Sequence, residues 1–329
     1  MMNIRRAKPS DKDFVLDFCM NTFEWGDYVY RVWDRWISDP SGLLLVYDSS
    51  NFPSTSKSIP LGIIHIVKCL GDILWLEGLR VNKIHRNKGI ATALLKYSLN
   101  YGINNGIKES SALVSTNNFP SQKMLEKLGF SKFLEYRYYN INLKKYRDDC
   151  NVSIKPDLVF SKKLDIKISQ FRDIFSIQEY LSNPEISKFC VSKYFDSWRL
   201  YDLNTSLSSL SSFVRNKELL IIVNDIDEIV GIAIVKPSGK ISFNGMPMIQ
   251  ISYLNCLNLS IFVRVIHLLL MNYCDVNLFN NAHFLLPVFA ELEKILSTKS
   301  IENSDRFFLY SKFLDTTSNL SSILPANLQ

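Results

Sequence analysis

Basic residues gather around a glycine in the stretch RVNKIHRNKGIATALLK, residues 80–96, and no Asp or Glu occurs between Glu77 and Glu109. An apolar, β-branched strand pattern precedes this stretch, and a helical pattern follows Gly89. The first turn of a helix presents unpaired N–H groups and the positive end of the helix dipole. Gly89 and Ala91 are small enough for a phosphate to approach the main chain. The stretch therefore predicts a polyphosphate site; a solvated basic turn is the alternative interpretation.

The predicted polyphosphate site combines main-chain N–H groups with one hydroxyl and nearby positive charge. Its residues are Arg86, Asn87, Lys88, Gly89, Ile90, Ala91 and Thr92. Their spacing fits neither the phosphate loop of nucleotide hydrolases nor the glycine-rich dinucleotide fingerprint.

Length and composition limit the classes of protein that the chain can belong to. Its 329 residues, 47% of them hydrophobic, are enough for two domains with separate cores. The first residues, MMNIRRAKPSDKDF, are too polar for a signal peptide, and the most apolar segment, 259–271, is too short to span a bilayer. Six cysteines lie far apart and four histidines are scattered, so we expect neither a disulfide framework nor a metal site. We expect a cytoplasmic protein without membrane or metal.

The net charge of +6 is compatible with a phosphate ligand or with nucleic acid. However, no second dense basic run occurs, and aromatic residues do not interleave with the one at residues 80–96. We therefore expect no nucleic-acid partner.

The first half of the chain alternates between strand and helix patterns. We expect strands at 3–8, 42–48, 61–70, 72–81, 111–116 and 130–143. Ser10 is the expected cap of a first helix, with Asp13 as its capping-box partner, and residues 28–37 form a second helix. The helix after the basic stretch is expected to stop at Gly102, and Pro120 and Gly129 bracket a short one. Gly71-Asp72 predicts a hairpin turn.

The second half repeats this rhythm from about residue 157. Helices are expected at 169–183, 205–215, 259–274 and 287–296, and strands at 218–225, 228–236, 248–258, 276–284 and 306–314. The order fits a degenerate second copy of the same α/β fold, with Asn258-Leu259-Ser260 in place of the glycine-containing turn. We predict a domain at 1–146, a linker at 147–156 and a second domain at 157–329 that binds no cofactor, with a tail from about 316 that is poorly ordered or docks elsewhere.

Two motifs resemble the GNAT superfamily of N-acetyltransferases. Arg86, Gly89 and Ala91 match its acyl-CoA motif R/Q-x-x-G-x-G/A, and NFPSQKMLEKLGF, 118–130, resembles its second signature at Asn118, Ser121 and Gly129-Phe130. The resemblance covers residues 1–145 and implies a mixed sheet flanked by helices, that is, a GNAT-like α/β (α+β) fold. WGDYVYRVWDRWISDPSG and WLEGLRVNKIHRNKGIATALL are similar to histidine N-acetyltransferase-like members, which also carry extra C-terminal sequence.

The resemblance implies acetyl-CoA as co-substrate. Its diphosphate would lie on the N–H groups of residues 87–92, and its pantetheine arm would run between splayed strands, next to Leu79 and Val81. Asn118 and Ser121 belong to the same implied binding set.

The implied reaction is attack of a neutral primary amine on the thioester, which needs a base. Glu77 is the candidate, since it stands in an apolar strand, and such a setting raises the pKa of a carboxylate toward neutrality. The alternative is an ion pair of Glu77 with Arg80 or Arg31. Many family members also carry a tyrosine, thought to protonate the leaving thiolate, where this chain has Leu125. Ser121 or Tyr97 would have to serve, or the thiolate leaves unaided, which a thiol pKa of about 8.5 tolerates.

The acceptor side in this family involves the first two helices. Trp25, Asp27 and Tyr28 are the candidate substrate-binding residues, because aromatic faces and carboxylates hold cations. Core packing of the aromatic residues is the alternative. We expect a small amine or amino acid as acceptor; a protein lysine or N-terminal acetyltransferase and a non-catalytic acetyl-CoA-binding regulator stay open, as do a monomer and a homodimer.

Overall fold

The computed structural model describes residues 4–20, 22, 26–48, 59–153, 163–183, 193–203, 205–241, 247–288, 301–303 and 305–314. The chain divides into two compact units. Unit 1 comprises Met1–Phe133 and Leu309–Gln329, and unit 2 comprises Leu134–Phe308. No helix among the described residues is long and apolar enough to cross a bilayer.

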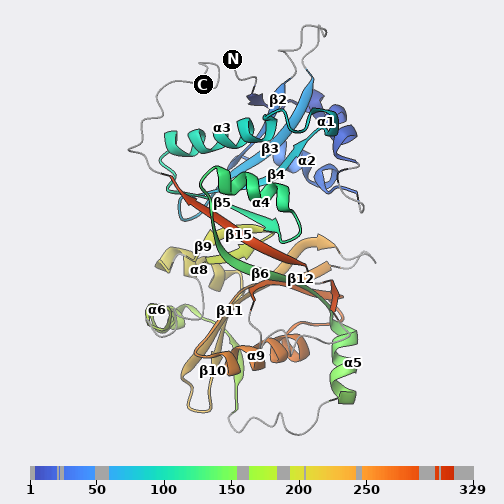
Figure 1. The fold of residues 1–329 in the computed structure, drawn as a ribbon. Coiled ribbons are helices and arrows are strands. Elements are labelled where there is room, and N and C mark those ends of the chain that lie inside the picture. The colour runs from blue at the N-terminus through green and yellow to red at the C-terminus, as the bar shows by residue number, and fades with distance from the viewer. Residues whose placement is uncertain are drawn as a thin grey trace. The chain divides into compact units, whose positions relative to one another are not determined.

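Unit 1 is a mixed sheet flanked by helices (Figure 1). Strands β1 to β5 lie in sequence order, antiparallel except for the parallel pair β4 and β5, and β15 follows β5. The elements are β1 (Ile4–Arg6), η1 (Pro9–Asp11), α1 (Lys12–Cys19), α2 (Val29–Ile37), β2 (Gly42–Asp48), β3 (Pro60–Cys69), β4 (Ile73–Val81), η2 (Lys83–His85), α3 (Ile90–Asn104), β5 (Glu109–Ser115) and α4 (Phe119–Lys127).

The core of unit 1 forms where α1 and α2 meet the sheet. Leu44, Val46 and Ile63 from the sheet are buried with Trp33 and Trp36 of α2. Helix α3 contacts β3 and β4 as well. The strands are therefore covered by helices, and β3 is buried along almost its whole length.

Two local predictions for unit 1 are wrong. Ser10 does not cap the first helix; the Lys8 N–H donates to Asp11 Oδ2 at 2.6 Å and opens a 3₁₀ turn before α1. Gly102 does not end α3, which continues to Asn104. A Cβ at Gly102 would lie 2.7 Å from Leu314 Cδ1, so this glycine is needed for close packing, while Gly106, at φ +66°, follows the helix end.

The end of the chain completes unit 1. Strand β15 (Arg306–Phe313) contributes its residues from Leu309 onward to this unit. Glu109 Oε1 accepts from the hydroxyls of Ser111 and Ser311, at 2.8 Å each. The Leu314 N–H donates to Lys108 O at 2.8 Å. The last described residues are thus hydrogen-bonded to β5 and to the segment before it.

Unit 2 repeats the element order of unit 1. Along the chain, an edge strand, a 3₁₀ turn and helices precede three antiparallel strands, and a helix joins the last of these to a parallel strand. In the sheet, the strands of unit 2 have the order β6-β13-β12-β11-β10-β7. The elements are β6 (Ser131–Asn142), α5 (Leu143–Ser153), β7 (Asp165–Ile168), η4 (Phe171–Asp173), α6 (Ile174–Ser182), β8 (Lys193–Asp196), β9 (Arg199–Asp202), α8 (Leu207–Arg215), β10 (Leu219–Val223), β11 (Ile229–Ile241), β12 (Pro247–Cys256), α9 (Leu259–Leu268), η5 (Leu269–Tyr273), β13 (Asn281–Pro287) and β14 (Ile301–Asn303).

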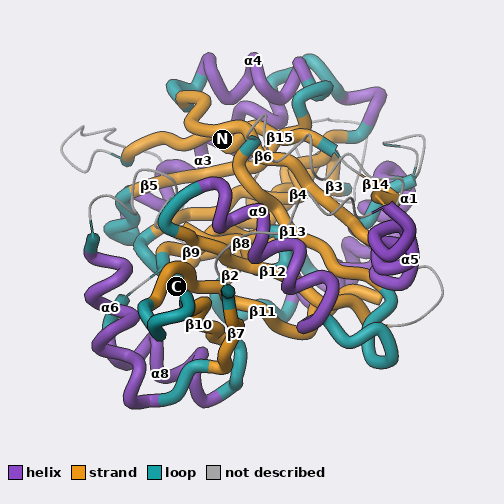
Figure 2. The backbone as a smooth tube through the Cα atoms, turned by 90° about the horizontal axis from the view of Figure 1, so that it is seen from below, coloured by secondary structure: helices purple, strands orange, loops and turns teal. Residues whose placement is uncertain are grey.

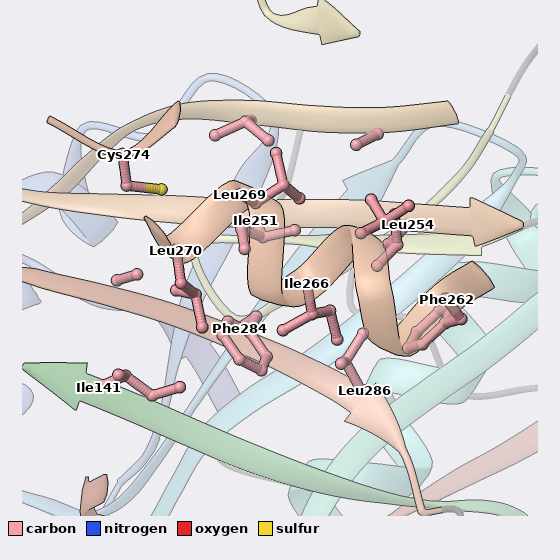
Figure 3. Packing of buried hydrophobic residues seen from close by; sticks show 14 of the residues in the cluster. Ile141, Ile251, Leu254, Phe262, Ile266, Leu269, Leu270, Cys274, Phe284 and Leu286 are labelled. Atoms are coloured by element: carbon pink, nitrogen blue, oxygen red, sulfur yellow. The ribbon is translucent and has the colours of Figure 1, made fainter. Parts of the chain in front are cut away.

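Both faces of the unit 2 sheet are covered, which explains its continuous apolar strands. In β10, Leu219 and Ile221 pack with α6 and α8, whereas Leu220 and Ile222 belong to the cluster that includes α9. Figure 2 shows α9 crossing the strands; α8 contacts β10 and α6 contacts β11. Figure 3 shows Leu269 of this helical segment next to Ile251 and Ile266 near Phe284, all in one buried cluster.

The boundary segments differ from the sequence-based expectation. The predicted linker 147–156 is largely helical, because α5 extends from Leu143 to Ser153. Arg147 Nε donates to Leu270 O at 3.1 Å and holds α5 to η5, a contact that spacing along the chain does not reveal. The compact units also assign residues 134–146 and 309–329 differently from the domain limits 1–146 and 157–329, which stay a prediction. The helix expected at 287–296 and the tail from 316 lie essentially outside the described residues.

Leu314→Ala tests whether the chain's end supports unit 1. Leu314 is buried against Gly102, so we expect the free energy of unfolding of unit 1 to fall by about 2–4 kcal/mol. The matched control is Phe313→Ala, since Phe313 is 82% exposed and its loss should change stability by less than about 0.5 kcal/mol. Denaturant titration, with hydrogen exchange of the β5 amides as the signal for unit 1, measures the free energy of unfolding of both variants. Equal effects of the two substitutions would contradict this role of the C-terminal strand.

Candidate active site

A β-bulge interrupts β4 next to Glu77. His65 of β3 pairs with Glu77 and Ile63 pairs with Arg80, so β4 contains one residue more than β3 between these pairs. Gly78 lies in this bulge with φ +66°. A Cβ there would lie 2.2 Å from Trp36 Cη2, so the indole of α2 presses directly on the bulge. Only glycine combines this backbone conformation with this contact.

Strands β4 and β5 pair over a short distance only. Their parallel ladder runs from Ile73, opposite Glu109, to Trp75, opposite Ser111. Strand β4 continues to Val81 and β5 to Ser115 without further recorded pairing between them. Leu79 and Val81 are half-buried in this unpaired part of β4. The edge that β4 presents beyond Trp75 is therefore of the kind to which an extended ligand can add as a strand.

The turn between β4 and α3 has unpaired main-chain donors. Asn87 and Gly89 adopt left-handed conformations, at φ +60° and +81°, and Gly89 is the N-cap of α3. The first helical hydrogen bond of α3 runs from the Ala93 N–H to Gly89 O, at 2.9 Å. Within the described residues, no acceptor is recorded for the N–H groups of Gly89, Ile90, Ala91 and Thr92. These donors carry the positive end of the α3 dipole.

The surroundings of this helix start are open and positively charged. A Cβ at Gly89 would meet no atom within 4 Å, so there is room above the donors. Arg86 and Lys88 are exposed, and Arg86 Nε donates to Val81 O at 3.3 Å, which links the turn to the end of β4. Burial, and then the Lys88 ammonium, lower the pKa of His85, so this imidazole stays neutral near pH 7. Arg86, Asn87, Lys88, Gly89, Ile90, Ala91 and Thr92 thus form one continuous turn, as their position in the sequence requires.

Asn118 and Ser121 lie at the start of α4. Asn118 Oδ1 accepts from the Ser121 N–H at 3.3 Å and caps the helix. Gln122 Nε2 donates to the carbonyls of Ser115 and Thr116, at 3.0 and 2.9 Å, and ties α4 to the end of β5. The Asn118 cap and the Gln122 hydrogen bonds give these residues of the second motif a structural role. Contact of Asn118 and Ser121 with a cofactor stays a prediction.

Glu77 has a buried histidine as its partner. His65 Nδ1 lies 2.9 Å from Glu77 Oε1, and His65 is fully buried while 14% of the Glu77 side chain is exposed. The sequence offered Arg80 or Arg31 as an ion-pair partner for Glu77; Arg80 binds Asp27, and Arg31 Nε donates to Tyr30. His65 was not among the predicted site residues, although residues 65 and 77 are equally distant from Gly71 in a hairpin and interrupt two otherwise apolar strands.

The acidic and aromatic residues near Glu77 form a connected cluster. Arg80 Nε donates to Asp27 Oδ2 at 2.6 Å, and the Val29 N–H donates to Asp27 Oδ1 at 3.0 Å. The Arg80 guanidinium lies over the ring of Tyr28, 5.2 Å from its centre, and Tyr28 meets Trp36 edge to face. Burial raises the pKa of Tyr28, which stays protonated near neutrality.

Of the predicted acceptor residues, the structure brings Asp27 and Tyr28 together. Asp27 is buried and orients Arg80, so packing accounts for it without a ligand. Tyr28 is half-buried, and Trp25 lies outside the described residues. Leu125, which stands where the family has a tyrosine, is buried. Tyr97, one of the two groups considered in place of that tyrosine, is buried too, and burial raises its pKa.

Unit 2 has a different connection at the equivalent place. Residues 82–89 join β4 to α3, whereas only 257–258 join β12 to α9. Asn258 Oδ1 accepts from the Ile261 N–H at 3.0 Å and thereby caps α9. Among the described residues, no three His, Cys, Asp or Glu side chains come together as metal ligands.

Comparison with known proteins agrees with this geometry. Residues 12–130 match the acetyltransferase (GNAT) family model. A GCN5-related N-acetyltransferase from Sphaerobacter thermophilus aligns with a TM-score of 0.59 at 11% identity, over 94% of this chain and 95% of that one. A tandem GNAT protein from the clavulanic acid biosynthesis pathway aligns with a TM-score of 0.53 at 12% identity, over 96% and 99%. A search of curated protein sequences finds no match.

The mixed sheet with its flanking helices is thus a GNAT fold, and the alignment with a tandem protein covers both units. Residues 12–130 match the GNAT acetyltransferase family model, and the second unit repeats a GNAT-like fold.

Gly78→Ala tests the contact that shapes the bulge. Gly106 is the matched control, because it has the same φ of +66° but a Cβ there would meet nothing within 4 Å. The left-handed conformation alone should cost about 1–2 kcal/mol in Gly106→Ala. We expect Gly78→Ala to lose about 1–3 kcal/mol more, because the methyl group collides with Trp36. Denaturant titrations of both variants measure the difference, and equal losses would show that Trp36 does not confine the bulge.

Proposed function

We propose that unit 1 transfers an acetyl group from acetyl-CoA to a primary amine. GNAT acetyltransferases use acetyl-CoA. The observation that carries the proposal is the row of unpaired N–H groups at Gly89, Ile90, Ala91 and Thr92, which opens into free space above Gly89. Such donors at a helix start suit a diphosphate, and Arg86 and Lys88 supply the opposite charge.

The pantetheine arm would then follow the part of β4 that β5 leaves unpaired. In this arrangement Leu79 and Val81 offer main-chain groups to the amides of the arm, in the manner of an added strand. Asn118 and Ser121 at the start of α4 would contact the other side of the arm. A strand amide near the bulge would hydrogen-bond the thioester carbonyl and stabilise the oxyanion that forms on it.

Glu77 is the proposed general base. Its side chain is 14% exposed, so a proton acceptor stands at a recessed position of β4 beside the bulge. The amine nitrogen forms a bond to the carbonyl carbon, the carbon–sulfur bond breaks, Glu77 takes the amine proton, and CoA leaves as thiolate. Leu125 supplies no proton, and a thiol with a pKa of about 8.5 is a leaving group that does not require one.

The proposed acceptor is a small amine, an amino acid among the candidates. Tyr28 presents its ring near Glu77 and Arg80, and Trp25 and Asp27 complete the predicted acceptor set. The same cluster suits an amine whose remaining groups are polar or aromatic. A non-catalytic acetyl-CoA-binding regulator is the second candidate, favoured by the buried Leu125 at the position of the family's tyrosine.

Gly89→Glu tests the diphosphate site. The carboxylate would occupy the space in which the phosphates are proposed to lie and would repel them, so we expect acetyl-CoA to bind at least about tenfold more weakly. Gly106→Glu is the matched control, as Gly106 also has positive φ and open space but lies at the other end of α3. Isothermal titration with acetyl-CoA measures both dissociation constants. Unchanged affinity in Gly89→Glu would refute the proposed site.

An assay of CoA release tests the reaction itself. Acetyl-CoA is supplied with amino acids, polyamines or peptides, and we expect turnover with a small amine. Glu77→Gln should lower kcat by about 10²–10⁴ without weakening acetyl-CoA binding. Asp34→Asn, which alters an exposed carboxylate paired with Lys12, is the control and should change neither. Tight acetyl-CoA binding without release from any of these amines would support the regulator instead.

A further inference from the structure

The environment of His65 is unusual for a buried imidazole. The ring is fully buried, it stacks on Trp36 with centroids 4.8 Å apart and 12° between planes, and Nδ1 lies 2.9 Å from Glu77 Oε1. Nε2 is buried and has no hydrogen-bond partner among the described residues, and neither has Nε1 of Trp36. Buried polar atoms are normally paired, so these two exceptions need an explanation.

The unpartnered nitrogen determines how the imidazole acts on Glu77. A Cβ at Gly42 would lie 2.7 Å from Nε2, so this glycine makes room for the ring. A protonated Nε2 would be a buried donor without acceptor, whereas an unprotonated Nε2 loses only a weaker interaction with water. The favoured tautomer therefore carries its proton on Nδ1 and donates it to the Glu77 carboxylate.

The two neighbours of His65 fix its orientation. Trp36 covers one face of the ring, and the same indole presses on Gly78, the residue that follows Glu77. The bulge and the hydrogen-bond donor thus share one support. Rotation of His65 would require Trp36 or Gly42 to move, so the donor is held at one place in β3 opposite Glu77.

We infer that His65 is a positioning residue for the base: it donates from Nδ1 to Glu77, holds one carboxylate oxygen, and favours the ionised form that accepts the amine proton. This inference rests on the proposed function of Glu77. Its chemistry resembles that of groups that orient a catalytic base in other enzymes, although His65 does not itself touch the reacting atoms. Among the described residues, Tyr28 lies within electrostatic reach of Glu77, Arg80 and Asp27.

A matched pair of substitutions tests the inference. Asn and Leu are both branched at Cγ and nearly equal in size, but only Asn can place an N–H donor where His65 Nδ1 stands. We expect His65→Leu to lower kcat by about ten- to a hundredfold and His65→Asn to retain most of the activity. A donor to the ionised carboxylate favours that form, so the acidic limb of the pH–rate profile should move to higher pH in His65→Leu only.

Glu77→Gln separates failure of this inference from failure of the proposed function. In the Glu77→Gln background, His65→Leu should cause no further loss of kcat, since no carboxylate remains to be oriented. If Glu77→Gln is inactive while His65→Leu and His65→Asn behave alike, the inference fails and the proposed base stands. If Glu77→Gln turns over like wild type, the proposed base itself fails. Acetyl-CoA affinity, measured on every variant, reports whether the fold is retained.

The tautomer of His65 provides a measurement that needs no functional variant. Nitrogen-15 NMR of the histidines in the wild-type protein distinguishes a protonated Nδ1 from a protonated Nε2, and His65→Asn assigns the signal. Protonation on Nδ1 at pH 7, with a change of the signal in Glu77→Gln, is the expected result. Protonation on Nε2 would overturn the inference even if His65→Leu did not fold.

Discussion

The contact of Trp36 with Gly78 is the constraint on which the arrangement of unit 1 depends. The indole occupies the space that a side chain at position 78 would need, and the glycine adopts a left-handed backbone that few other residues tolerate. This bulge lies between Glu77, which meets His65, and Arg80, which meets Asp27. One aromatic side chain of α2 thereby relates the packing of the core to the position of the candidate base.

The two units share the order of their strands and helices but differ at the start of one helix. Both have antiparallel strands followed by a helix and a parallel strand, and apolar clusters between helices and sheet form the core of each. Their differences lie at the start of that helix. In unit 1 the residues 82–89 include two left-handed positions and leave N–H groups unpaired, whereas in unit 2 Asn258 caps α9 after a two-residue connection. The shared strands and helices form the packed core. The left-handed turn with unpaired N–H groups is what binding of an anion would require.

Strand β15 links the stability of unit 1 to the far end of the chain. Its residues from Leu309 onward belong to the same compact unit as Met1–Phe133. The Tyr310 hydroxyl donates to Glu126 of α4 at 2.9 Å, and burial, followed by this carboxylate, raises the pKa of Tyr310 to about 12. Lys312 Nζ donates to Leu128 O at the end of the same helix. The helix with the second motif is therefore held by residues almost two hundred positions away.

Local patterns in the sequence determined the strands and helices of unit 1, the hairpin at Gly71-Asp72, and the basic turn before α3, because glycine, proline and apolar periodicity act within a few residues. They did not predict α5, β8 or β9 of unit 2. The roles of the turn, of Asn118 and Ser121, and of the acceptor residues stay predictions. Tertiary structure alone decided that Gly102 serves packing against Leu314, that Arg80 binds Asp27, and that a buried His65 stands opposite Glu77. These are contacts between residues distant in sequence, and no local pattern contains the strand register or the side-chain volumes that create them.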